Sequence, residues 1–204
     1  IDFVEEEGVR EAMQEFVNPL ADLGDKVTKL TTELGMKAFQ NPDEVGAEAA
    51  GQGLPAMMRR LHDGKATQPS FAPPFLKDGE FWVGQTAAIL HYLAPELKLV
   101  ARSEPARVWT QQIQLTITDM VAEAHDTHHP VGAGLYYEDQ KPEALRRAKE
   151  FCSARMPKYL QWFERIVVHN PAGSRHLVGG KLSYADLSLF QLVEGFGISL
   201  VHII

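Results

Sequence analysis

Apolar residues recur at every third or fourth position through the second half of the chain, which is the spacing of one face of an α-helix. A first long helix is predicted from the apolar stripe Trp109, Ile113, Ile117, Met120, Val121 and Ala124. A second is predicted over Glu143–Val168, with a kink at Pro157. A third helix begins after Ser183 and is apolar nearly all round. A helix of that kind is expected in a core.

The first half of the chain alternates short apolar runs with turn residues. Ile1–Val4 is rich in β-prone residues and predicts a short strand. Two further runs, Phe75–Leu76 and Phe81–Val83, flank an Asp-Gly pair, which is a strong signal for a β-hairpin. Thr86 follows the second run and is predicted to cap a short helix. The pattern therefore predicts a mixed α and β part followed by an all-helical part.

Composition narrows the classes of function. The 204 residues carry 20 basic and 27 acidic side chains and a net charge of −7. Nucleic-acid binding usually needs a basic excess, so we expect no nucleic-acid partner. No run of about 18 apolar residues exists, so no membrane span is expected. The single cysteine, Cys152, cannot form an internal disulfide, which fits a reducing compartment. Its place within a helix predicts an inert packing residue.

Ser183 and Asp186 form a variant of the capping box at the start of the third helix. The serine hydroxyl can accept from the backbone N–H of Asp186, and the carboxylate can reach back to the N–H of Ser183. This spacing is satisfied by a structural role, so we predict a cap rather than a catalytic pair.

Pro73-Pro74 and Gln85-Thr86 form a second constellation, on either side of the predicted hairpin. A proline at the start of a strand is a common place for a cis peptide bond, and we predict one between Pro73 and Pro74. A polar pair at a helix N-terminus offers N–H groups to a carboxylate. The four residues could frame one small anionic ligand, or they could be loop and cap residues only.

The segment His125-Asp126-Thr127-His128-His129 gathers residues that ligate metals. Histidines three or four positions apart can share a helix face, as zinc sites require. A third or fourth ligand is not visible in the sequence and Pro130 ends the helix at once, so polar lining of a cleft is the alternative to a metal site.

Two segments, one with the Pro73-Pro74 pair and the hairpin turn and one with the helix that follows, resemble segments of a known protein family. Residues 71–79, FAPPFLKDG, and residues 84–93, GQTAAILHYL, are similar to the strand, hairpin and helix that end the thioredoxin-like half of cytosolic glutathione transferases. The Leu182–Asp186 segment resembles the capping box of that family's helical half, and Phe151–Glu164 its central kinked helix. The resemblance covers residues 54–194. It implies an incomplete α+β thioredoxin-like domain over 1–94, a linker over 95–102 and an all-α domain over 103–204.

The resemblance also implies a function and a site. Pro74 would be the cis-proline beside the cysteinyl part of glutathione, and Gln85 and Thr86 would hold the γ-glutamyl carboxylate. The helical domain would bind a small hydrophobic electrophile, with His128, His129, Tyr136 and Tyr137 placed where that site lies. The activity would be conjugation of the glutathione thiolate to the electrophile in a cytoplasmic, detoxifying homodimer. Glutathione would be a co-substrate and no cofactor would be needed.

Two positions differ from the family pattern. Pro73 has no N–H to offer to the ligand's peptide. Ile1–Val4 resembles the family's second strand, so the first strand and helix, with the thiol-activating residue, are expected outside this chain and the catalytic residue is unassigned. Two alternatives follow: a non-catalytic binding module of the same fold, and a metal-binding protein that uses His125, His128 and His129.

Overall fold

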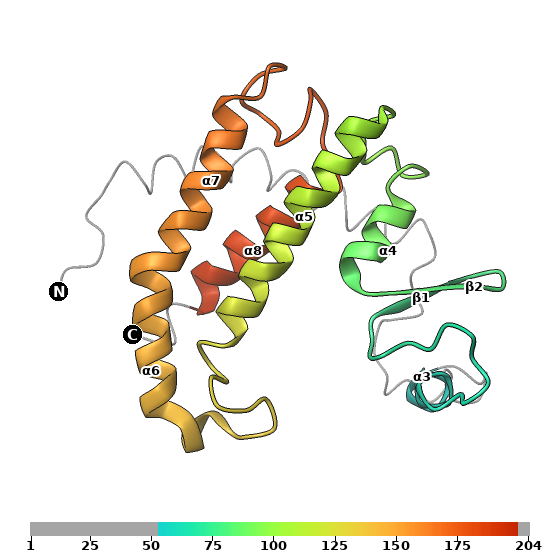
Figure 1. The fold of residues 1–204 in the computed structure, drawn as a ribbon, viewed down its shortest axis with the longest axis vertical. Helices are drawn as coiled ribbons and strands as arrows, with labels where there is room; N and C mark the ends of the chain where they lie inside the picture. The colour runs from blue at the N-terminus through green and yellow to red at the C-terminus, as the bar shows by residue number, and fades with distance from the viewer. Residues whose placement is uncertain (1–52, 200–204) are drawn as a thin grey trace. The chain divides into compact units, whose positions relative to one another are not determined.

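The computed structural model describes residues 53–199 and divides the chain into two compact units, which meet in sequence between Ile89 and Leu90. The predicted strand at residues 1–4 lies outside the described residues. The element order matches the predicted mixed α and β part followed by an all-helical part (Figure 1). No helix among residues 53–199 is long and apolar enough to cross a membrane.

The first unit contains a helix, a hairpin and the start of a second helix. In order these are α3 (Gly53–Leu61), β1 (Phe75–Asp78), β2 (Phe81–Gly84) and α4 (Thr86–Leu93). The strands pair antiparallel, with Phe75 opposite Gly84 and Asp78 opposite Phe81. Gly79 has a φ of 57°, which a turn residue without a Cβ adopts freely. The hairpin is therefore confirmed at the predicted place.

Trp82 is the centre of a small cluster of aromatic and cation–π contacts on the hairpin. Its ring lies 5.8 Å from that of Phe75, and the guanidinium carbon of Arg60 lies 4.4 Å from its centroid. The Lys77 ammonium is 5.5 Å from the same ring. Arg60 also donates to the carbonyl of Gln68 at 2.6 Å. Cation–π contacts thus attach α3 and the loop that follows it to β2.

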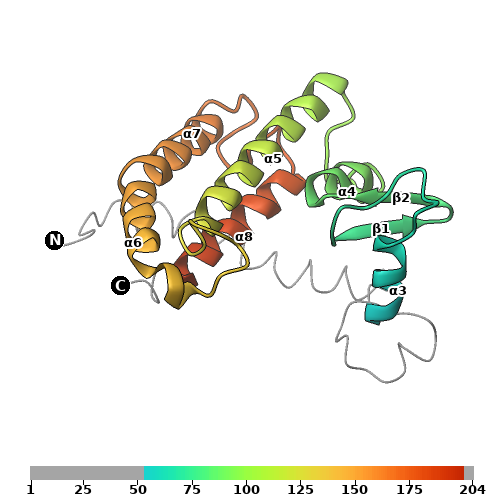
Figure 2. The ribbon, with the colours of Figure 1, turned by 60° about the horizontal axis from the view of Figure 1, so that its bottom comes forward.

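The second unit is all-helical. Its elements are α5 (Glu104–His125), the short 3₁₀ turn η2 (Tyr137–Gln140), α6 (Lys141–Glu150), the π-helical turn η3 (Phe151–Arg155), α7 (Met156–Val168) and α8 (Tyr184–Ser199). Helix α8 packs along α5, and α6 and α7 form one bent column beside them (Figures 1 and 2). The three expected long helices are therefore confirmed.

The buried face of α5 differs from the predicted stripe. Ile113, Ile117 and Met120 are buried as expected, but Val121 is 48% exposed. Thr110 and Gln114 take the remaining buried positions. Thr110 satisfies its hydroxyl by donating to the carbonyl of Ala106 at 2.8 Å, so a polar residue can occupy this core-facing position.

The bend in the α6–α7 column lies N-terminal to the predicted kink. Pro157 falls in the first turn of α7, and the irregular turn is η3, before it. Proline has no N–H, so it leaves the carbonyl of Ser153 without its usual helical donor. The chain widens instead, and the N–H of Met156 donates to the carbonyl of Phe151, five residues earlier. Pro157 therefore causes the bend, but the backbone departs from α-helical geometry in the turn before it, η3.

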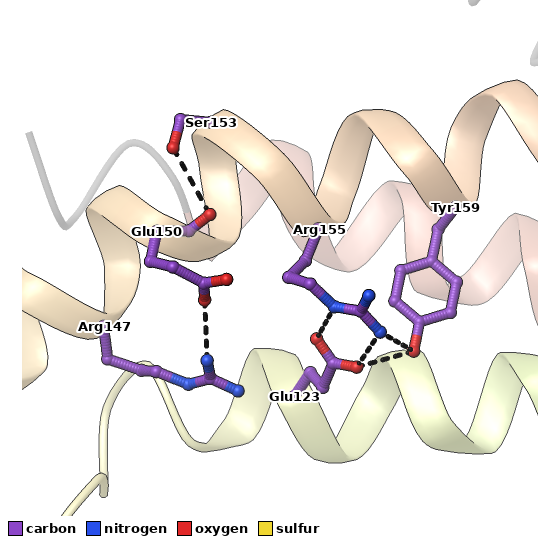
Figure 3. Close-up of polar contacts among 6 residues, drawn as sticks. All are labelled: Glu123, Arg147, Glu150, Ser153, Arg155 and Tyr159. Atoms are coloured by element: carbon purple, nitrogen blue, oxygen red, sulfur yellow. Dashed lines mark hydrogen bonds and ion pairs between the residues drawn. The ribbon is translucent and has the colours of Figure 1, made fainter.

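A polar cluster joins η3 to α5 across this bend (Figure 3). Arg155 donates from Nε and Nη2 to the two carboxylate oxygens of Glu123, at 2.8 and 2.6 Å. The Tyr159 hydroxyl donates to Glu123 at 2.7 Å. Arg147 forms a separate ion pair with Glu150 at 2.6 Å. The bidentate geometry fixes the orientation of η3 relative to α5.

Candidate functional site

The hairpin brings the two halves of the Pro73-Pro74 and Gln85-Thr86 constellation together. Phe75 pairs with Gly84, so the residues just outside that pair, Pro74 and Gln85, lie at the same end of the ladder. A Cβ on Gly84 would lie 3.9 Å from the carbonyl oxygen of Pro74, which confirms how closely the two segments approach. Pro73, Pro74, Gln85 and Thr86 are all exposed.

Gln85, rather than Thr86, occupies the capping position of α4. Its carbonyl accepts the first helical bonds, from Ala88 at 3.0 Å and Ile89 at 2.9 Å. Thr86 is already the first helical residue, so its predicted capping role is wrong. Gln85 has a φ of 67°, in the left-handed region that non-glycine residues rarely adopt. This conformation turns the chain directly from β2 into α4.

The start of α4 is suited to an anion. The first N–H groups of a helix have no acceptor within it, and the helix dipole places partial positive charge there. No acidic residue occurs in the first turn of α4. The Pro73–Pro74 bond is cis, as predicted. Because Pro73 cannot donate from its backbone, hydrogen-bond donors for a ligand here come from the Gln85 and Thr86 side.

The four residues expected around the electrophile lie on one loop, which we call the α5–α6 loop (residues 126–136), and on η2 directly after it. The His128 and Tyr137 rings are 6.0 Å apart. His129 instead stacks on His125 at 5.1 Å. Tyr136 is 80% exposed. The structure therefore pairs His128 with Tyr137 and gives His129 and Tyr136 different surroundings.

The side chain of Gln140 fixes the conformation of the α5–α6 loop through hydrogen bonds to its backbone. The sequence alone did not identify this residue. Its side chain is fully buried. Oε1 accepts from the N–H of Val131 at 3.0 Å, and Nε2 donates to the carbonyls of Gly132 and Leu135, each at 3.2 Å. Nε2 also lies 3.3 Å from His129 Nδ1. The available signal was a polar residue at the start of a helix after a glycine-rich loop, which is too common to be diagnostic.

The metal alternative gains no support from the geometry. In the part of the chain that the structure describes, no three His, Cys, Asp or Glu side chains are grouped so that they could hold a metal ion. His125 Nδ1 lies 3.7 Å from Asp126 Oδ1. The two residues are neighbours in sequence, so this contact does not show that the fold gathers ligands here. Cys152 is half-buried in η3, and burial raises the pKa of its thiol. A raised pKa disfavours the reactive thiolate, in line with a packing role.

The capping box is confirmed and does more than cap. The N–H of Ser183 donates to Asp186 Oδ2 at 2.7 Å, and the serine hydroxyl donates to the same oxygen at 2.6 Å. The N–H of Asp186 donates in return to the Ser183 hydroxyl at 3.4 Å. Asp186 Oδ1 also accepts from the N–H of Leu177 at 2.7 Å. The buried carboxylate therefore ties the α7–α8 loop (residues 169–182) to the start of α8.

Comparisons with known proteins agree with these elements. Residues 125–200 match the family model described as the glutathione S-transferase C-terminal domain. The chain is 25% identical over 121 residues to glutathione S-transferase P 1 of Xenopus laevis, covering 59% of this chain and 51% of that protein. It is 29% identical over 124 residues to glutathione S-transferase 2 of Onchocerca volvulus, covering 59% and 52%. The chain thus spans about half the length of these curated relatives.

A solved structure shares the fold. A glutathione S-transferase from Caenorhabditis elegans superposes with a TM-score of 0.50 at 19% identity, covering 63% of this chain and 59% of that one. The fold is that of a glutathione transferase: part of a thioredoxin-like unit followed by an all-helical unit. The family model and both curated relatives are glutathione S-transferases, so the sequence matches and the fold agree in their similarity to glutathione transferases.

Proposed function

We propose that this protein is a glutathione transferase that joins the thiolate of glutathione to a small hydrophobic electrophile. Glutathione must lose its thiol proton to attack, and a neighbouring donor stabilises the resulting anion. We propose that this activating residue lies outside residues 53–199. The described residues would then bind and orient the two substrates.

One observation carries the proposal: the hairpin places Gln85 and the start of α4 beside Pro74. Phe75 and Gly84 form the last pair of the ladder, and Gln85 turns the chain with a φ of 67°. The first N–H groups of α4 would receive the γ-glutamyl carboxylate of glutathione, aided by the helix dipole. Thr86 would add a hydroxyl donor, and Pro74 would face the cysteinyl part. The names of the matched relatives supply the identity of the ligand.

The electrophile is proposed to contact the α5–α6 loop and η2. His128 and Tyr137 present neighbouring rings, and Tyr136 is largely exposed. Such aromatic side chains offer flat apolar surface with polar edges, which suits aromatic electrophiles. Gln140 would hold this surface in one conformation without touching the substrate. We further propose a cytoplasmic homodimer that needs no cofactor beyond its co-substrate.

The test of glutathione binding uses the 204-residue chain and calorimetric titration of glutathione. Gln85→Ala and Thr86→Ala should each weaken binding by about fivefold to tenfold, since each removes a hydrogen-bonding side chain at the carboxylate. Gln161→Ala is the matched control, because Gln161 is exposed on α7 and belongs to the other unit. Equal affinity in all four proteins would overturn the proposed site.

The test of catalysis is conjugation of glutathione to chlorodinitrobenzene by the 204-residue chain, followed by absorbance. A rate above the uncatalysed reaction, lost in Thr86→Ala at low glutathione, supports the transferase. Binding of glutathione without any rate increase would assign the protein instead to a non-catalytic binding module.

A further inference from the structure

The segment between α3 and β1 ends in Pro73 and Pro74, which belong to the proposed glutathione site (Figure 2). We call residues 67–74 the prolyl loop. Seven of its eight residues are exposed, so packing does little to hold it. In the part of the chain that the structure describes, the loop makes one hydrogen bond: Arg60 Nη2 donates to the carbonyl of Gln68 at 2.6 Å. The position of the two prolines is therefore tied to Arg60.

The guanidinium of Arg60 is itself seated on the hairpin. Its central carbon lies 4.4 Å from the centroid of the Trp82 ring on β2. That ring contacts the ring of Phe75 at 5.8 Å, and Phe75 directly follows Pro74. A planar guanidinium can stack on a ring with its face while its edge donates a hydrogen bond. Arg60 therefore reaches Pro74 from both sides, along the loop and across the hairpin.

The contacts of Arg60 are not those that would stabilise the fold most. None of the ion pairs found among residues 53–199 includes Arg60. Its Nε is buried without a hydrogen-bond partner, which costs free energy. Such unsatisfied groups are rare in folded proteins. A role in placing the prolyl loop accounts for an arginine here better than a role in stability does.

We propose that Arg60 is a positioning residue for glutathione, because it holds the prolyl loop where Pro74 faces the cysteinyl part of the ligand. This inference rests on the proposed function. A loop that is already fixed loses less conformational entropy when the ligand binds, so the affinity is higher. Arg60 acts through the loop and needs no contact with glutathione.

The test is calorimetric titration of glutathione into the 204-residue chain and its Arg60→Gln variant. The dissociation constant should rise about fivefold to tenfold in the variant, because the ligand must then order the loop. Arg60→Lys should bind as weakly, since an ammonium is a point charge that cannot stack and donate with the fixed geometry of a guanidinium. The number of sites per chain should stay as in the parent. A purely structural role would instead unfold part of the sample, which lowers the number of sites and leaves the dissociation constant of the folded part unchanged.

Lys77→Gln is the matched control for the loss of charge. Lys77 Nζ lies 5.5 Å from the centroid of the same Trp82 ring, but the hydrogen bond to the prolyl loop comes from Arg60. This variant should bind glutathione within about twofold of the parent. Trp82→Leu removes the ring on which the guanidinium stacks and should weaken binding as Arg60→Gln does. Trp82→Phe keeps an aromatic ring and should retain most of the affinity.

The outcomes separate the role of Arg60 from the proposed function. A parent chain that does not bind glutathione overturns both. If the parent binds, unchanged affinity in Arg60→Gln or an equal loss in Lys77→Gln overturns the positioning role alone. Full affinity in Arg60→Lys or in Trp82→Leu does the same, because stacking would then not matter. Fewer sites at an unchanged dissociation constant would assign Arg60 to stability instead.

Discussion

Glu123 and Arg155 are 32 residues apart in sequence, yet they form a two-point ion pair that joins α5 to the π-helical turn η3 (Figure 3). The side chain of Glu123 is 21% exposed, so the pair is only partly screened by solvent. The hydrogen bonds from Arg155 contribute most to holding the pKa of Glu123 at about 2, against its ordinary 4.5, while burial opposes this shift. The pair therefore stabilises the bend that Pro157 imposes.

Glu123→Gln should lower the free energy of unfolding by about 1–2 kcal/mol, because it removes the charge while Arg155 stays in place. Urea denaturation at neutral pH measures the change. Glu150→Gln is the matched control, since its ion pair with Arg147 lies three residues along one helix and is more exposed. That variant should lose less than about 0.5 kcal/mol. Equal losses would mean that the link between α5 and η3 adds nothing.

Stability should fall in acid through the same carboxylate. The folded pKa of Glu123 is depressed to about 2, so the unfolded state binds the proton first as the pH drops. The contribution is complete above about pH 4.5 and is lost as the pH falls toward 2. Urea midpoints across this window should converge for the parent chain and Glu123→Gln. A gap between them that stays constant with pH would contradict this assignment.

Ser183→Ala combined with Asp186→Ala should lower stability by about 1–3 kcal/mol, because the start of α8 loses its cap and the N–H of Leu177 loses its acceptor. Thermal melting measures the loss. Glutathione affinity of the folded fraction should stay within about twofold of the parent, since neither side chain belongs to the proposed site. Lost affinity at an unchanged melting temperature would make this pair functional instead.

Gln140→Ala should release the α5–α6 loop and lower stability by about 1–3 kcal/mol, because Val131, Gly132 and Leu135 lose a buried partner. Amide hydrogen exchange should accelerate most at Val131 and Gly132. Gln161→Ala is the control at an exposed helical position and should leave exchange in the loop unchanged. Slow exchange in Gln140→Ala would show that other contacts hold the loop.

Gln85→Gly should raise stability by a few tenths to about 1 kcal/mol, because glycine adopts a left-handed φ without steric cost. It should also weaken glutathione binding, since the side chain is lost. Lys98→Gly tests the two effects separately: Lys98 has a φ of 58° and lies outside the proposed site. It should gain similar stability with unchanged glutathione affinity. Unfolding and calorimetric titration of both variants check the prediction.

Features that depend on neighbouring residues could be predicted from the sequence alone. The Asp-Gly hairpin, the Ser183–Asp186 cap and the three long helices were all recovered, because turn geometry, capping and helical periodicity act over a few residues. The apolar stripe of α5 located the helix but misplaced part of its buried face. Val121 is exposed and Gln114 is buried, the reverse of what their hydrophobicity predicts. The packing of α8 along α5, rather than hydrophobicity alone, determines which face of α5 is buried.

Features that depend on distant residues needed the tertiary structure. The partners of Glu123, the loop contacts of Gln140 and the ring on which Arg60 stacks join segments whose separation in sequence carries no local signal. The left-handed turn at Gln85 was also missed, since glutamine has no preference for that conformation. Sequence determined which elements form, because local free energies decide them. Tertiary packing decided which polar groups are buried together, because a buried polar group is stable only when the fold brings it a partner.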